Sequence, residues 1–179
     1  MKRLSLLLVF VLCLARTAYA QPQATQSSQA IALVQSFYDW YLPIVTDDSL
    51  KERATDIVIE RRPELFDRPL LRALQIDAAA QAKADLIPAI DGLDGDPFVD
   101  TNGEPAPHFK ATRASGPLVT VVGYDEQLSK PLVTLTIEVR CKQSRCVIVN
   151  VHYPAHDGIP KSNLLSILRE LHPPAKPKP

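Results

Sequence analysis

The sequence predicts an α+β fold in which N-terminal helices pack on a curved antiparallel sheet of three to four strands, with a short C-terminal helix. Two observations support this prediction. All six glycines lie at or after Gly92, and the preceding part is rich in Ala, Leu, Arg and Gln. The part after Gly92 contains β-branched runs that alternate apolar and polar residues. Helices followed by hairpin-connected strands are typical of the α+β class.

Three segments before Gly92 have helical patterns. Residues 31–42, IALVQSFYDWYL, carry a broad apolar stripe at helical spacing, and Pro43 is expected to end or bend that helix. A second helix is predicted over about 50–61, with Asp48 or Ser49 as N-cap. A third is predicted over about 69–87. Its expected apolar face contains Leu70, Leu71, Leu74, Ala78 and Ala82.

Three later runs, residues 117–124, 130–140 and 145–153, alternate with the period of a strand. The middle run places one apolar set on a single face: Val133, Leu135, Ile137 and Val139. The last run is expected to set Val147, Val149 and Val151 against Ile148, Asn150 and His152. A short amphipathic helix follows, with Ser162 as its predicted N-cap.

The first twenty residues have the pattern of a secretory signal peptide. Lys2 and Arg3 precede an apolar run of about eleven residues, and Ala18-Tyr19-Ala20 forms a small-x-small cleavage site before Gln21. That run is shorter than the roughly 20 residues of a membrane-spanning helix. Lipidation at Cys13 is the alternative, but the preceding residue, Leu12, is not small. We therefore expect a periplasmic or secreted protein without a transmembrane segment in the mature chain.

The remaining chain is expected to form one domain. Residues 21–28 are polar and lack periodicity, which predicts a flexible leader, and 29–172 form the α+β domain. The proline-rich residues 173–179 are expected to be an extended tail. The whole chain has 20 basic and 20 acidic residues, and the signal peptide holds three basic and no acidic ones, so the mature chain has a net charge of −3. Without a basic cluster, a nucleic-acid partner is not expected.

The mature chain contains two cysteines, Cys141 and Cys146. An even pair in an exported protein predicts a disulfide bond. Four residues separate them, whereas a redox C-x-x-C motif has two, so we interpret the pair as a structural bridge across a hairpin. Because the closed loop is short, the expected stabilisation is only about 2 kcal/mol.

The segment DGLDGDPFVDTNGE, residues 91–104, concentrates acidic and amide side chains. Placing Gly103 at the sixth position of an EF-hand loop puts Phe98 first and Phe109 twelfth, so the calcium-binding pattern is absent. An irregular cation site or an acid/base centre stays open, and its candidate residues are Asp91, Asp94, Asp96 and Asp100. We favour a turned loop that Phe98 and Val99 anchor to the core and whose carboxylates cap backbone amides.

His152, His156 and Asp157 form a second candidate cluster, which could hold zinc. Pro154 lies between the histidines, so ordinary surface histidines are favoured and no metal or other cofactor is expected. The local motifs of serine hydrolases, phosphate-binding loops and zinc metalloproteases are absent from the sequence.

Three stretches together resemble a domain of unknown function found in small secreted proteins and lipoproteins of Gram-negative bacteria. They are FYDWYL, LLRALQIDAAAQAKAD with GLDGDPFVD, and CVIVNVHYP with LLSILREL. The distinctive D-x-D-P-F-x-D loop falls on Asp94, Asp96, Pro97, Phe98 and Asp100. The chain departs from that pattern at Lys142 to Arg145, where a Gly-Trp turn is usual, and in lacking the common lipid anchor. The resemblance implies a cone similar to nuclear transport factor 2-like domains, and it implies no activity.

The favoured function is a non-catalytic binding or protein-interaction module of the cell envelope, with an immunity-type protein as one form. Such a cone encloses a pocket, and Tyr38, Trp40 and Tyr41 are candidates for its mouth, although packing in the core is the favoured explanation of these aromatic residues. The alternative is a small enzyme or cation-binding protein that uses the acidic loop. Asp96, Asp100 and His152 would then be its candidate acid/base residues.

Overall fold

The computed structural model describes residues 21–50, 52–84, 92–100, 104–128, 130–155, 158 and 160–173, with side chains from residue 26 onward. The predicted signal peptide at 1–20 lies outside the described residues, as do Asp91 and residues 101–103 of the acidic loop. His156, Asp157 and residues 174–179 of the predicted tail also lie outside them.

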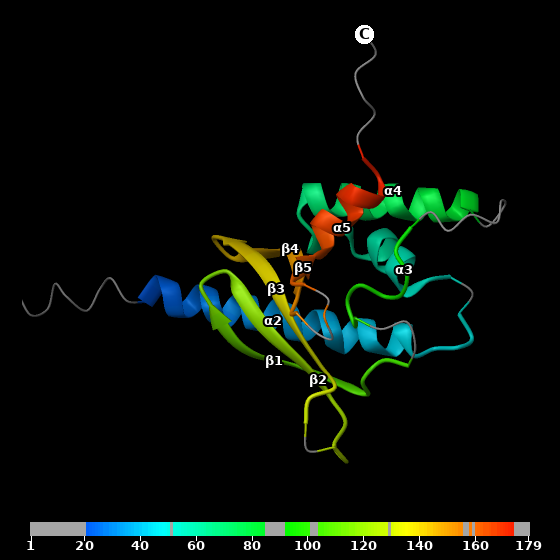
Figure 1. Ribbon diagram of the computed structural model, residues 1–179. Coiled ribbons are helices and arrows are strands. Elements are labelled where there is room, and N and C mark those ends of the chain that lie inside the picture. Colours follow the sequence, from blue (N-terminus) through cyan, green and yellow to red (C-terminus); the bar gives the residue numbers. More distant parts are fainter. Residues whose placement is uncertain are drawn as a thin grey trace, which may run out of the picture.

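The fold is α+β, as predicted, with helices first, then an antiparallel sheet and a short final helix (Figure 1). The helical elements are α2 (Gln21–Val45), α3 (Ala54–Arg61), η1 (Pro63–Leu65), α4 (Arg68–Ala84) and α5 (Leu164–Leu171). The strands are β1 (His108–Ser115), β2 (Leu118–Tyr124), β3 (Val133–Lys142), β4 (Arg145–Tyr153) and β5 (Ser162–Asn163).

The sheet has the order β1-β2-β3-β4-β5, and each neighbouring pair is antiparallel. Helix α2 crosses one face of this sheet, while α3, α4 and α5 gather beyond β4 and β5 (Figure 1). Strand β1 was not predicted from the sequence, because HFKATRAS alternates only weakly, and the burial pattern of this strand alternates over its first five residues alone. Its register with β2 then shifts between Ala111 and Arg113.

Helix α2 begins at Gln21, so residues 21–28, for which the sequence predicted a flexible leader, are part of a helix. Pro43 lies inside the last turn of this helix, two residues before its end at Val45. The apolar stripe of α2 is buried against the sheet as expected. The residues of α2 in the core are Ala30, Val34, Phe37, Tyr38 and Tyr41.

Helix α3 begins later than predicted, because Asp48 and Ser49 are part of a turn and do not cap it. The Asp47 carboxylate accepts bonds from the Ser49 N–H at 3.0 Å and from its hydroxyl at 2.6 Å, and this bonding fixes a non-helical turn. The residue before the helix is Arg53, whose guanidinium makes two bonds to Asp56 in the first turn at 3.0 and 2.7 Å.

The predicted alternation on β4 is wrong at its centre, because the strand contains a bulge. Glu138 pairs with Asn150 while Val139 pairs with Ile148, so Val149 is an extra residue on β4. The bulge changes which side chains face the core. Ile148, Val151 and Tyr153 are buried, whereas Val147 and Val149 are half-buried.

The start of α5 also differs from the prediction. Its N-cap is Asn163, whose side-chain oxygen accepts the Ser166 N–H at 3.0 Å, and Ser162 belongs to β5. The Asn163 oxygen also accepts a bond from the side-chain amide of buried Asn150, at 2.9 Å. This amide pair fixes α5 to β4. Among the described residues, no helix is both long and apolar enough to cross a membrane.

Candidate functional site

The central part of the acidic loop is buried in the core. Phe98 is fully buried and Val99 is 1% exposed, as predicted for anchors of the loop. The Asp100 N–H donates to the Asp96 carbonyl at 3.0 Å, and Asp100 itself has a φ of +52°, which closes a tight turn. The Asp96 carboxylate accepts the Phe98 N–H at 2.9 Å. Asp96 therefore caps a backbone amide as the sequence analysis expected.

Three tyrosines hold this loop through their hydroxyl groups. Tyr38 donates to the Phe98 carbonyl at 2.8 Å and Tyr153 donates to the Pro97 carbonyl at 2.9 Å. Tyr41 donates to the Asp96 carboxylate at 2.6 Å. These hydroxyls satisfy polar groups that the buried loop would otherwise leave without partners. The network thereby joins three parts of the fold: helix α2, strand β4 and the acidic loop.

The environment of Asp96 favours the neutral form of its carboxyl group. Burial raises its pKa, while the Tyr41 hydroxyl, the Phe98 and Val99 N–H groups and the Arg53 charge act in the opposite direction. Burial is also the main cause of the raised pKa of Tyr38, Tyr41 and Tyr153, and the Asp96 charge adds to it. Burial thus favours the protonated form of the three tyrosines and of Asp96.

The aromatic residues proposed for a pocket mouth lie in the core. Tyr38 and Tyr41 are at most 1% exposed, and the Phe37 ring contacts both of them with centroids about 5 Å away. These contacts fill the space between α2 and the sheet, so the expected pocket between them is closed at this point. Trp40 is half-buried, and the Arg62 guanidinium lies 5.4 Å from its ring. Asp94 and Asp100 are exposed, and the charge of Asp100 adds to the effect of burial on the pKa of Tyr38 and Tyr153.

A buried carboxylate that sequence reasoning missed, Asp77 on α4, is 1% exposed. Its Oδ1 lies 2.9 Å from His172 Nε2 and accepts the Leu93 N–H at 3.1 Å. Its Oδ2 accepts a bond from the Gln81 amide at 3.0 Å and lies 3.8 Å from Arg53 Nη1. The position of Asp77 in the helical pattern was the sequence signal that could have identified it. Asp77 follows Leu70 and Leu74 at helical spacing, inside the apolar stripe, where a charged residue needs partners.

Of the predicted histidine cluster, only His152 lies in the described part of the chain. His152 Nε2 lies 3.1 Å from the Glu138 carboxylate on the neighbouring strand. Its proposed partners, His156 and Asp157, lie outside the described residues. Within those residues, no group of three or more His, Cys, Asp or Glu side chains is arranged to hold a metal ion.

The disulfide bond between Cys141 and Cys146 is confirmed, with the sulfur atoms 1.99 Å apart. The two residues are direct cross-strand partners on β3 and β4, and the turn between the strands contains Gln143, which has a φ of +58°. The bridge therefore closes the tip of the β3–β4 hairpin.

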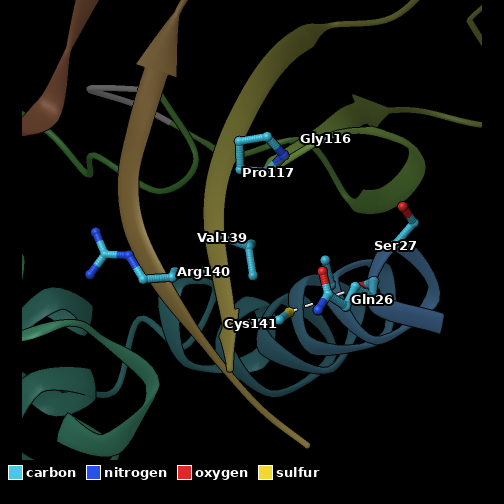
Figure 2. A pocket seen from close by; sticks show the side chains of 8 residues that line it. Gln26, Ser27, Gly116, Pro117, Val139, Arg140 and Cys141 are labelled. Carbon is cyan, nitrogen blue, oxygen red and sulfur yellow. Dashed lines mark hydrogen bonds between the residues drawn. The ribbon is translucent and has the colours of Figure 1, made fainter. Parts of the chain in front are cut away.

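A cleft of about 300 Å³ lies beside this disulfide, at the N-terminal end of α2. One wall is formed by the first turns of α2 and the other by the β1–β2 turn and the end of β3 (Figure 2). The lining residues are Gln26, Ser27, Ala30, Gly116, Pro117, Val139, Arg140 and Cys141. The Arg140 guanidinium points away from the cleft (Figure 2). It pairs with Asp67 at 3.4 Å. The cleft surface is therefore formed mainly by small, apolar and uncharged polar groups.

Comparisons of the chain with models of protein families, with curated proteins and with solved structures found no match.

Proposed function

We propose that this protein is a non-catalytic binding or protein-interaction module that works in the periplasm or outside the cell. The signal-peptide pattern at 1–20 supports export. The Cys141–Cys146 disulfide supports an oxidising compartment, because such bonds are rare in the reducing cytosol. The likeness of the D-G-D-P-F-V-D loop to the uncharacterised Gram-negative envelope family remains part of this proposal.

The observation that carries the binding function is the cleft between α2 and the β1–β2 turn. Its volume of about 300 Å³ is at the lower end for ligand pockets in proteins. Its lining combines the apolar surfaces of Ala30, Pro117 and Val139 with the polar side chains of Gln26 and Ser27. Such a surface suits a small amphipathic ligand or one side chain of a partner protein. The involvement of Asp96 in fixed bonds to Tyr41 and Phe98 supports a structural role for the acidic loop.

The test is native mass spectrometry of the protein purified from the envelope without reductant or chelator. We expect a chain that begins at Gln21, two hydrogens lighter than the dithiol, with a retained organic adduct. Ser27→Trp should fill the cleft and abolish the adduct. Ser36→Trp, at an exposed position of the same helix, should retain it. An unprocessed chain, or an adduct that Ser27→Trp leaves unchanged, would contradict the proposal.

One observation favours the enzyme alternative, namely the half-buried Asp96 with its raised pKa, since such carboxyl groups occur at catalytic centres. The matched change is Asp96→Asn, which keeps the shape and an acceptor for the Phe98 N–H. If a panel of ester, glycoside and peptide substrates reveals turnover that Asp96→Asn abolishes without lowering the melting temperature, the enzyme alternative replaces the binding module. If none of these substrates is converted, Asp96 remains assigned to the structural network.

A further inference from the structure

The two sulfur atoms of the disulfide have different surroundings. Cys141 lines the cleft and its Sγ lies 3.9 Å from the Gln26 carbonyl oxygen, whereas Cys146 is not among the lining residues (Figure 2). Both cysteines are only half-buried. A reagent inside the cleft would therefore meet Cys141 first.

The order of the strands places the cleft on the side of Cys141 away from its partner. Cys146 lies on β4, on one side of β3, and the β1–β2 turn at Gly116 and Pro117 lies on the other side. The Val139 N–H donates to the Pro117 carbonyl at 2.7 Å, which fixes this turn beside β3. In thiol–disulfide exchange, the entering and leaving sulfurs lie on opposite sides of the attacked sulfur. A thiolate in the cleft would approach Cys141 from the side required.

The charges of the hairpin favour a leaving thiolate. Arg140, Lys142 and Arg145 are exposed, and the sequence from Val139 to His156 contains no acidic residue. Arg140 pairs with the Asp67 carboxylate at 3.4 Å, and the pKa of Glu64 is lowered, first by Arg62 and in smaller part by Arg145. Neighbouring cations lower the pKa of a thiol, and a thiol of lower pKa leaves a disulfide faster.

We propose that Cys141–Cys146 is a thiol–disulfide exchange site, at which the thiolate of a partner protein entering through the cleft attacks Cys141 Sγ. A bond forms between the partner sulfur and Cys141 Sγ as the Cys141–Cys146 bond breaks. The electron pair leaves on Cys146 as a thiolate, next to Arg145 in the sequence. A second thiol of a dithiol partner then releases Cys141 as a thiol and becomes oxidised to a disulfide. This inference rests on the proposed function, because the cleft that admits the thiol is the proposed binding cleft.

The test uses reduced glutathione as the thiol and the folded, oxidised protein. The reaction is quenched with acid, free thiols are alkylated, and peptides are identified by mass spectrometry. We expect glutathione on Cys141 and the alkyl group on Cys146. Ser27→Trp should slow mixed-disulfide formation at least about fivefold, whereas Ser36→Trp should react as the wild type does. Arg145→Gln should slow it about threefold, because the leaving thiolate loses a neighbouring cation.

Several outcomes would overturn the inference: no mixed disulfide on the folded protein, glutathione on Cys146 or equally on both, or equal rates for Ser27→Trp and Ser36→Trp. If Ser27→Trp does not fold, Gln26→Trp fills the same cleft from an exposed position and takes its place.

The experiments distinguish failure of the exchange site from failure of the proposed binding function. Normal exchange at Cys141 without a retained envelope ligand removes only the binding function, and a ligand displaced by Ser27→Trp without exchange removes only the redox site.

Discussion

At the scale of single residues, Asp77 connects parts of the chain that are distant in sequence. Its carboxylate contacts Gln81 on its own helix, Leu93 beyond α4, and His172 at the end of α5, with Arg53 at 3.8 Å. A buried carboxylate without these partners would be strongly unfavourable, since its lost hydration would not be replaced. Asp77 therefore ties the C-terminal helix and the start of the acidic loop to α4.

We predict that Asp77→Ala lowers the free energy of unfolding by about 3 kcal/mol, because the Leu93 N–H loses its acceptor and Gln81 and His172 lose the carboxylate that they contact. His172→Ala should lower it by only about 1 kcal/mol, because the other donors keep the carboxylate satisfied. Urea denaturation measures both. Asp48→Ala, at an exposed position in the turn before α3, is the control. Equal effects of Asp77→Ala and Asp48→Ala would contradict the role of Asp77 as a connecting residue.

At the scale of elements, β1 is an edge strand, and α2 supplies a side chain that occupies part of its free edge. Gln35 accepts the Ala111 N–H at 2.9 Å through Oε1 and donates to the Phe109 carbonyl at 3.2 Å through Nε2. One amide side chain thus forms the pair of bonds that a neighbouring strand would form. Covering an edge in this way hinders its pairing with another chain.

We predict that Gln35→Leu lowers the free energy of unfolding by about 1–3 kcal/mol, because two edge groups of β1 lose their partners. The uncovered edge should also promote self-association at high concentration. Urea denaturation and sedimentation velocity measure the two effects. Gln75→Leu, an exposed position on α4, adds the same apolar side chain without removing these bonds. The role assigned to Gln35 is wrong if both variants behave alike.

At the scale of the whole molecule, the tyrosine network couples the stability of the fold to alkaline pH. Tyr38, Tyr41 and Tyr153 all have a pKa raised above the ordinary value of 10.0, chiefly by burial. Above pH 10 the unfolded chain releases these protons while the folded chain retains them. The stabilisation they provide is thus complete below pH 10 and is lost as the pH rises further.

We predict that the free energy of unfolding falls above pH 10 by up to about 4 kcal/mol per pH unit from these three tyrosines. Tyr153→Phe should reduce this slope by about one third, since one retained proton is removed. Denaturation series between pH 9 and 11 measure the slope, and absorbance near 295 nm reports tyrosine ionisation. Ionisation of all tyrosines before the chain unfolds would contradict the prediction.

The sequence alone determined features that depend on local patterns. The α+β order, the apolar stripe of α2 and the buried face of β3 follow from periodicity, because a helix or strand must bury its apolar side. The Cys141–Cys146 bond follows from the short spacing of two cysteines between strand-forming runs. The turn chemistry of Asp96 and the anchoring by Phe98 were also evident, because aspartate binds nearby backbone amides and phenylalanine favours the core.

Only the tertiary structure decided the features that depend on contacts between distant segments. The bulge at Val149, the Asn163 cap and the partners of Asp77 each require a residue whose position no local pattern gives. The same reason applies to the candidate site. The pocket expected near Tyr38 and Tyr41 is filled by their own rings, and the cleft lies where the first turns of α2 meet the β1–β2 turn and Cys141. Packing between elements, which the sequence specifies only through the whole fold, determines where space is left.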